Sequence, residues 1–407
     1  MKKFLLKFIK RFLLILGLLA GLLLLYILFN LNLFHRTRPP GREQLKSYLL
    51  HTDSLDPLHF VADKFETHDI VFIGEIHKRK QDLDFLKALI PFLYKEKGIK
   101  IIGWEFGAAA YQREADSIVT ASTLDRKKAI ALMRNSNCFW AYEDYLDIFR
   151  VIWDCNRAIA QDSNKIRFLQ LNGVYVPRRF DSPDPAIRLA ERTTASFDVM
   201  APGIVEKEVI ALHKKILIYC GIHHALTHFK TPKFLFLKDN DLRAGQHLYT
   251  QYPDKIFDID LLAPFPPRWT AFRALTHQQE GSYVFPFDAV FNQLYDSIRH
   301  PFAVNSRDPV LGRLKDYNSF YAFDRITGVP LSEFCDGIIM LAPFDQIKAV
   351  DSIPDWVTSS GELEAVKHVL PIEDTGKIKT RSDLFSYINS AQNLEAIRQF
   401  HRIRKFW

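Results

Sequence analysis

Short segments rich in apolar residues recur along the chain after residue 65, and longer segments with helical apolar spacing separate them. The short segments lie at residues 70–73, 100–105, 165–172, 215–220, 255–261 and 337–342. Buried parallel strands have short, largely apolar sequences of this kind, whereas amphipathic helices repeat their apolar positions every three or four residues. The alternation of the two patterns predicts an α/β fold, with a mostly parallel sheet flanked by helices.

A different pattern occupies the N-terminus, where residues 12–34 include no charged side chain and leucine dominates. An apolar run of this length can span a bilayer, whereas a cleaved signal peptide has a shorter apolar region followed by a small-x-small site. The run therefore predicts one uncleaved N-terminal transmembrane helix. Cationic residues lie on both sides of it, but more precede it. The positive-inside bias thus predicts a cytoplasmic N-terminus and an extracytoplasmic main domain at the cell membrane.

The composition describes a globular protein with a basic N-terminal stub. The chain has 407 residues, 48% of them hydrophobic and 25% charged, and a formal net charge of +7. Eight of the 54 basic residues and none of the 47 acidic residues lie in 1–42, so the remainder is close to neutral. The basic balance thus gives no support to nucleic-acid binding. We divide the chain into stub, anchor and linker (1–42) and one α/β domain (43–407), with an irregular aromatic-rich insertion or cap around 264–330.

Acidic and histidine side chains stand where three of the predicted strands end. Gly74 follows the first apolar run and precedes Glu75 and His77, and Glu105 ends the second run. The fourth run leads into Gly221-Ile-His-His224, which repeats the arrangement of a strand, a glycine and then a histidine. Ligands bind beyond the carboxyl ends of parallel strands, so we expect these four side chains at the rim of one site. A Glu-x-His pair often occurs by chance, but its recurrence at a second strand end favours function.

Two imidazoles and two carboxylates are compatible with two kinds of chemistry. His77, His224 and Glu75 could hold a divalent metal that activates water, such as zinc, manganese or iron. The same residues could hydrolyse a substrate without metal, with a histidine or glutamate as general base. Glu105 is our choice for that base, because it needs only to reach the water. His223 and His224 cannot both point the same way, so we expect one of them either to pack in the core or to support the site from behind its ligand-binding residues.

The remaining aromatic residues, histidines and cysteines of interest are expected to have structural roles. Trp140, Tyr142 and Tyr145 are expected in the core or in a wall of the site, although a tyrosine can also ligate haem iron. His228 and His277 have no partner visible in the sequence. Cys138 and Cys335 lie near element ends and could pair, while the other two cysteines fit free buried thiols. No Gly-x-Ser-x-Gly elbow, Walker loop or dinucleotide fingerprint is present.

These motifs, in this order, resemble the superfamily that joins erythromycin esterases, ChaN-type haem-uptake lipoproteins and Tiki/TraB proteins. The spacing of Glu75 and His77 is similar to that in ChaN and Tiki-like proteins, while the chain length and the middle helix are similar to those of the esterases. The resemblance covers roughly residues 65 to 345. The matching positions are Gly74, Glu75, His77, Trp104, Glu105, Trp140, Tyr145, Asn156, Gly221, His224, Gly245, Leu248 and Asp336.

The resemblance implies an EreA/ChaN-like fold and a membrane-anchored extracytoplasmic hydrolase. Its substrate would be an ester, lactone or amide, in a small molecule or a peptide, and the aromatic-rich cap suggests a bulky apolar one. The alternative that the resemblance implies is a ChaN-like haem-binding protein in iron or haem uptake.

Overall fold

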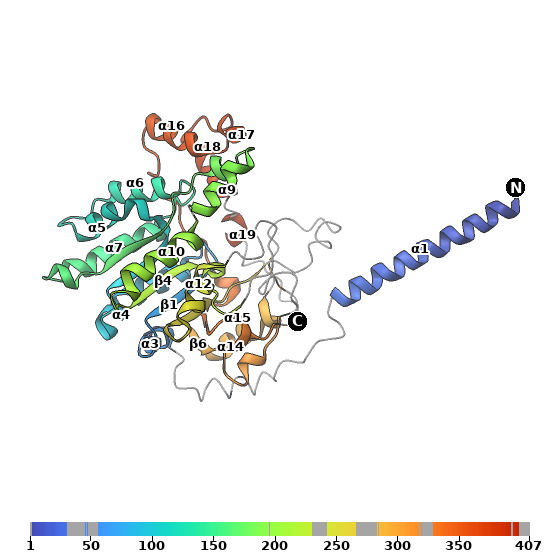
Figure 1. Ribbon diagram of the computed structural model, residues 1–407, viewed down its shortest axis with the longest axis horizontal. Coiled ribbons are helices and arrows are strands. Elements are labelled where there is room, and N and C mark those ends of the chain that lie inside the picture. The colour runs from blue at the N-terminus through green and yellow to red at the C-terminus, as the bar shows by residue number, and fades with distance from the viewer. Residues whose placement is uncertain are drawn as a thin grey trace.

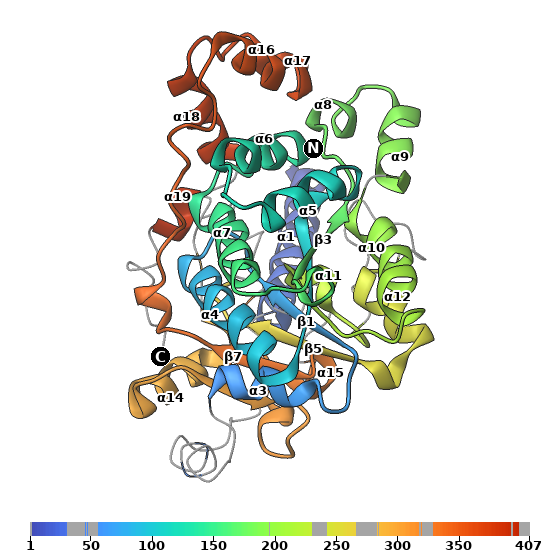
Figure 2. The same cartoon turned by 90° about the vertical axis from the view of Figure 1, so that its left-hand side faces the viewer.

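The computed structural model contains one seven-stranded sheet with the strand order β3-β2-β4-β1-β5-β7-β6 (Figures 1 and 2). It describes residues 2–30, 45, 47, 56–194, 196–229, 242–265, 283, 285–316, 319, 329–391 and 394–398. The strands are β1 (Ile70–Glu75), β2 (Ile101–Ala108), β3 (Arg167–Asn172), β4 (Ile216–Gly221), β5 (Ile256–Leu261), β6 (Phe302–Asn305) and β7 (Gly337–Met340). All neighbours run parallel except β6 and β7. The predicted mostly parallel α/β fold is therefore confirmed.

Strand β1 lies inside the sheet, between β4 and β5. Its side chains alternate between two hydrophobic clusters, with Val71 and Ile73 in one and Ile70 and Phe72 in the other. Because both faces are covered, every residue of β1 is buried, which explains the uninterrupted apolar run in the sequence.

The face of the sheet that carries Val71 and Ile73 packs against one layer of helices (Figure 2). Within it α4 and α7 lie side by side. Gly98, with φ of 64°, ends α4 in the left-handed conformation that glycine adopts without strain. The helices of this layer are α3 (Pro57–Lys64), α4 (Lys80–Lys97), α5 (Gln112–Thr120), α6 (Arg126–Ser136) and α7 (Glu143–Arg157).

The opposite face packs against α10, α11 and α12, and the β6–β7 end has a core of its own with α14 and α15. These helices are α10 (Phe197–Val205), α11 (Ile222–Ala225), α12 (Ala244–Gln251), α14 (Val290–Ile298) and α15 (Leu331–Phe334). The other helices are α8 (Pro177–Phe180), α9 (Pro185–Thr194), α16 (Ser360–Val369), α17 (Ile372–Thr375), α18 (Arg381–Ala391) and α19 (Leu394–Arg398). Together the two layers leave the carboxyl edge of the sheet to carry the site.

Three details of the structure depart from the sequence analysis. Strand β6 lies inside the segment 264–330, which we expected to be irregular. It has four residues and ends at the exposed Asn305, so its apolar pattern is too short to indicate a strand in the sequence. The polar segment 177–185, whose sequence predicts an irregular loop, contains the short helix α8. Cys138 and Cys335 are buried free thiols in different hydrophobic clusters, so the disulfide left open by their spacing is not formed.

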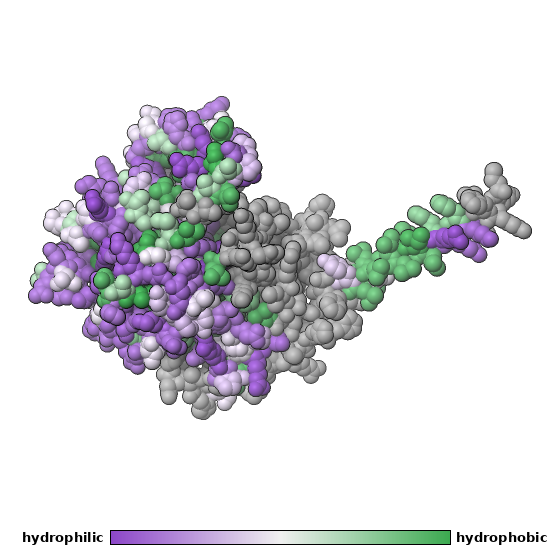
Figure 3. Space-filling view, viewed as in Figure 1, coloured by the Kyte–Doolittle hydropathy of each residue, from purple (hydrophilic) through white to green (hydrophobic). Residues whose placement is uncertain are grey.

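The N-terminal helix α1 (Lys2–Asn30) stands apart from the body in Figure 1. Its segment Lys7–Tyr26 has a mean hydropathy of 2.3 and is not buried, and Figure 3 shows a largely apolar surface along it, with hydrophilic side chains toward its N-terminal end. This helix is long and apolar enough to cross a membrane, a property that signal sequences share. Residues 31–44, including the end of the predicted span and the linker, lie outside the described part of the chain.

Candidate active site

A cavity of about 300 Å³ opens at the carboxyl ends of β1 and β4. Among the described residues it is lined by Glu75, Ile76, His77, Lys78, Gly221, Ile222, His223, His224, Arg243, Tyr283 and Ile397. A larger hollow of about 540 Å³ lies at the other end of β2 and β3, and it contains none of the predicted site residues. Three of the predicted strand-end residues, Glu75, His77 and His224, therefore line the smaller cavity, and Glu105 contacts two of its lining residues, Gly221 and His224.

Glu75 lines the cavity, and both of its carboxylate oxygens have hydrogen-bond partners. Its Oε1 accepts the hydroxyl of Tyr145 at 2.5 Å and lies 2.8 Å from Nδ1 of His77, and its Oε2 accepts the hydroxyl of Tyr219. Burial, with the charge of Glu75, raises the pKa values of both tyrosines well above their usual range, so both stay donors. Glu75 is thus placed to accept the Nδ1–H of His77, so that Nε2 is the ring nitrogen left for other partners.

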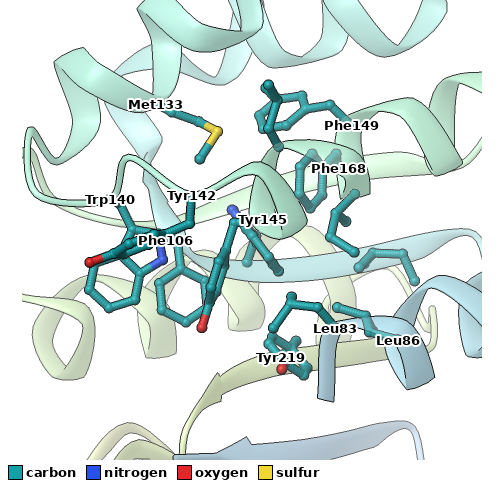
Figure 4. Close-up of a cluster of buried hydrophobic side chains, with 14 of the residues drawn as sticks. Leu83, Leu86, Phe106, Met133, Trp140, Tyr142, Tyr145, Phe149, Phe168 and Tyr219 are labelled. Atoms are coloured by element: carbon teal, nitrogen blue, oxygen red, sulfur yellow. The ribbon is translucent and has the colours of Figure 1, made fainter. Parts of the chain in front are cut away.

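Aromatic rings hold His77 from the side. Its ring makes edge contacts with Trp140 at 5.1 Å and Phe106 at 5.4 Å between centroids, and those two rings stack on each other at 4.8 Å. Figure 4 shows Phe106, Trp140, Tyr142 and Tyr145 as one group, with Tyr219 nearby. Trp140 packs beside His77 as a wall of the site, as expected. Tyr145 also has a role in the site, because its hydroxyl donates a hydrogen bond to Glu75.

The second histidine lies between two carboxylates. Nδ1 of His224 is 2.7 Å from Oδ1 of Asp198, and its Nε2 is 3.4 Å from Oε1 of Glu105. Burial alone would lower the pKa of His224, but Asp198 and Glu105 together raise it. His224 therefore favours the imidazolium form.

Asp198 and Arg243 are site residues that the sequence analysis missed. The Asp198 carboxylate accepts hydrogen bonds from Arg243 Nη1 and from the backbone N–H of Ala244, both at 2.9 Å. The pKa of Asp198 lies well below its usual range, because His224 and Arg243 outweigh burial. Asp198 starts helix α10 with no distinctive neighbours, so no motif marks it.

Lys78 is a third residue that the sequence analysis missed. Its backbone has φ of 71°, and its N–H donates to the hydroxyl of Tyr145 at 2.9 Å. Its ammonium group lies over Trp140, 5.7 Å from the ring centroid. Burial lowers the pKa of Lys78 to about 8, although Glu75 acts in the opposite direction. A strained backbone of this kind persists only where its surroundings hold it, and it is frequent at functional sites.

The two glutamates reach the site from opposite faces of the sheet. Glu75 has the same strand parity as Ile73 and contacts tyrosines from β4 and α7. Glu105 approaches His224 of α11, on the other face, and its Oε2 accepts the Gly221 N–H at 2.5 Å. Side chains alternate along a strand, so this edge brings together one pair from each layer.

The predicted metal set includes His77, His224 and Glu75, which all line this cavity. Each histidine turns Nδ1 toward a carboxylate, which leaves Nε2 as its possible ligand atom, while both oxygens of Glu75 already accept hydrogen bonds from tyrosines. Among the described residues, the group of three whose ligand atoms lie within 4.8 Å of one another is His228, Asp258 and Asp336. His228 therefore does have neighbours of this kind, whereas His277 lies outside the described residues. His223 and His224 both line the cavity, so neither is a mere packing residue.

Fold and site together define an α/β protein with two histidine–carboxylate pairs at one sheet edge. No protein-family model and no curated protein matches the chain. A solved structure of a mutant of erythromycin esterase EreC in its open conformation is similar, with TM-score 0.48 and 12% identity over 76% of this chain and 98% of that chain. A Bacillus cereus protein gives TM-score 0.46 and 13% identity over 74% and 98%.

A third similar structure, of cofacial heme binding to ChaN of Campylobacter jejuni, gives TM-score 0.33 and 14% identity over 50% and 85%. The esterase and ChaN belong to the groups that the sequence motifs resemble. The esterase activity and the heme binding that these names mention are properties of those proteins.

Proposed function

We propose that the protein is a hydrolase in which the His77–Glu75 pair supplies the base and His224, held by Asp198 and Glu105, stabilises negative charge, without a metal in this cavity. The observation that carries the proposal is the different setting of the two histidines that line one cavity. Nδ1 of His77 lies against Glu75, which leaves its Nε2 for water or substrate, whereas Asp198 and Glu105 lie on both sides of His224 and raise its pKa.

The proposed reaction is attack of water on the carbonyl carbon of an ester, lactone or amide. His77 Nε2 takes a proton from the water as its oxygen bonds to the carbonyl carbon, and Glu75 stabilises the imidazolium formed. His224 and Lys78 face the negative charge that develops on the carbonyl oxygen. The bond to the leaving group then breaks, and the leaving oxygen or nitrogen takes the proton from His77. The apolar side chains of Ile76, Ile222 and Ile397 in the cavity fit an apolar substrate.

Glu105 remains the alternative general base. It shares a neighbour with His77, since a Cβ placed on Gly221 would lie 3.5 Å from Oε2 of Glu105 and 3.0 Å from Nε2 of His77. The Gly221 N–H bond and the contact with His224 favour a positioning role instead. A carboxylate that holds a backbone N–H and an imidazolium is a weaker base than one free to reach water.

The test is hydrolysis of p-nitrophenyl esters, lactones and peptide amides of varied acyl size by the full-length protein in detergent. His77→Gln should lower kcat/KM at least about 100-fold on any substrate found. Glu105→Gln should do the same if Glu105 is the base, but less if it only positions His224. Circular dichroism confirms that each variant is folded. Undiminished turnover in His77→Gln would rule out the assignment.

Haem binding is the second candidate function. His77 and His224 are the residues through which the cavity could ligate iron, because Tyr145 is fully buried and already bonded to Glu75. Haemin titration distinguishes the two functions. A Soret band that depends on His77 or His224, together with no hydrolysis of any ester, would replace the hydrolase with a haem carrier.

We also propose that α1 anchors the protein in the cell membrane, with the α/β domain on the extracytoplasmic side. The apolar, exposed segment Lys7–Tyr26 supports this proposal. The full-length protein should resist carbonate extraction and retain residues 1–30 by intact mass, and an added protease should reach the α/β domain from outside. A mass lacking the N-terminal segment would instead identify a signal sequence.

A further inference from the structure

Outside the cavity, His228, Asp258 and Asp336 form a buried cluster in which each offers an atom within 4.8 Å of the others. Asp258 is in the middle of β5, Asp336 immediately precedes β7, and His228 follows α11. None of the three lines the cavity of the candidate active site. The cluster therefore joins three segments on the face of the sheet covered by α11 and α12.

Each of the two carboxylates accepts a hydrogen bond from the backbone N–H of the other residue, and Oδ2 of Asp258 has no such partner. The Asp336 N–H donates to Oδ1 of Asp258 at 3.2 Å, and the Asp258 N–H donates to Oδ2 of Asp336 at 3.3 Å. Oδ2 of Asp258 is buried without a hydrogen-bond partner, and the residue is wholly inaccessible. An unpaired buried carboxylate oxygen is costly, so it indicates a missing partner.

The charges of the cluster do not balance. Nη2 of Arg307 lies 2.7 Å from Oδ1 of Asp336 and supplies one positive charge for two carboxylates. Lys64 also acts on Asp336 from a distance, but its ammonium lies 4.1 Å from the ring centroid of Phe60. One negative charge is left in a buried place, where a proton or a cation must compensate it.

The histidine presents the nitrogen that a cation would use. The Thr227 hydroxyl donates to Oδ1 of Asp258 at 2.9 Å and lies 2.9 Å from Nδ1 of His228. The hydroxyl has one hydrogen, which goes to Asp258, so Nδ1–H of His228 must donate to the hydroxyl. Nε2 then carries a lone pair, and it is buried without a hydrogen-bond partner. A metal-ligating histidine is usually oriented by such a bond from its other nitrogen.

We propose that His228 Nε2 and the carboxylates of Asp258 and Asp336 bind one divalent transition-metal ion, Zn²⁺ or Mn²⁺. One imidazole with two carboxylates is a ligand set that suits these ions. Bound there, the ion supplies the missing positive charge and ties β5 and β7 to the segment after α11. The proposed site is structural and is separate from the chemistry of His77 and His224.

The test uses the full-length protein in detergent, stripped with EDTA and then dialysed against Zn²⁺ or Mn²⁺. Elemental analysis should find about one ion per chain, and the melting temperature should rise as the ion concentration rises. His228→Ala and Asp258→Asn should lose both effects. His77→Ala should keep both, which separates this site from the cavity. Asp254→Asn, an exposed position just before β5, is the matched control and should also keep both.

Three results would overturn the proposal. They are no ion and no thermal shift with either metal, binding that survives in His228→Ala, and binding lost only in His77→Ala. With no ion bound, a rise in the melting temperature of Asp258→Asn would assign the missing charge to a shared proton. Thr227→Val covers the case in which Asp258→Asn does not fold. It removes the hydroxyl that orients His228 and should weaken ion binding at least about 10-fold.

Discussion

Gly221 and His77 are packed so closely that glycine is required at position 221 by space alone. A Cβ built on Gly221 would lie 2.7 Å from Cε1 and 3.0 Å from Nε2 of His77. The φ of Gly221 is −62°, which any residue adopts, so backbone conformation does not demand glycine here. The backbone of β4 therefore forms one wall for the imidazole of β1.

Gly221→Ala should push His77 aside and lower hydrolytic activity at least about 10-fold, while the protein stays folded. The matched control is Gly203→Ala in helix α10, where an added Cβ meets no atom within 4 Å. That change should leave activity intact and raise stability by up to about 1 kcal/mol, because alanine favours helix. Kinetics and thermal unfolding of the two variants measure the difference. Equal activity in the two variants would show that hydrolysis does not depend on the position of the His77 ring beside Gly221.

Tyr145→Phe should destabilise the protein by about 1–3 kcal/mol, because the lost hydroxyl removes one of the hydrogen bonds to buried Glu75 and the acceptor of the Lys78 N–H. Tyr142→Phe is its control in the same helix layer, since the Tyr142 hydroxyl is buried with no hydrogen-bond partner. Its removal should be neutral or stabilising. Urea unfolding gives both values. A similar loss in both variants would contradict the role given to Tyr145.

Asp198→Asn should change how stability depends on pH. The pKa of His224 is raised in the folded protein, so its stabilisation is complete below the usual histidine pKa of 6.5 and is lost as pH rises through the raised pKa. The pKa of Asp198 is lowered, so its contribution is present above the usual aspartate pKa of 3.8. The pair thus stabilises most between these values.

The difference in unfolding free energy between the native protein and Asp198→Asn should accordingly be larger near about pH 5.5 than near about pH 9. Denaturant unfolding at both pH values measures it, with the exposed Asp254→Asn as control. A difference that does not vary with pH would mean that His224 is not held as an imidazolium.

Lys78 should set an alkaline limb on the pH–rate profile. Its pKa is lowered to about 8 by burial, so its positive charge is lost as pH rises past that value. If the charge stabilises the transition state, activity falls along the same limb. Lys78→Met should lower kcat and remove the limb, while Lys78→Arg should keep part of the activity and move the limb to higher pH. A limb unchanged in Lys78→Met would assign it to another group.

The strands and the four strand-end residues could be predicted because both depend on local sequence. Continuous apolar runs mark buried strands, and the residue that follows a strand must lie at the edge of the sheet. Asp198 and Tyr219 could not be predicted in this way, since their contacts to His224 and Glu75 join segments 26 and 144 residues apart. The metal assignment to His77, His224 and Glu75 rested on residue types. The structure shows instead how hydrogen bonds already occupy Glu75.

A buried arginine shows the same limit. Arg79 is almost wholly inaccessible and donates to the carbonyls of Ile76, Leu261 and Leu262, which fixes the turn that carries His77 against the end of β5. It also pairs with Asp82 at 2.5 Å. In the sequence these two residues read as the polar start of an amphipathic helix. Only the fold places them inside.

The approach of Glu75 and Glu105 from opposite faces divides the site between two independent cores. One pair depends on the packing under α7 and the other on the packing under α10, with the sheet itself as a partition. Mutations in the layer under α10 could therefore change the surroundings of His224 during evolution while the layer under α7, and His77 with it, stays the same. Such modular inheritance would let proteins of this architecture diverge in chemistry one half-site at a time.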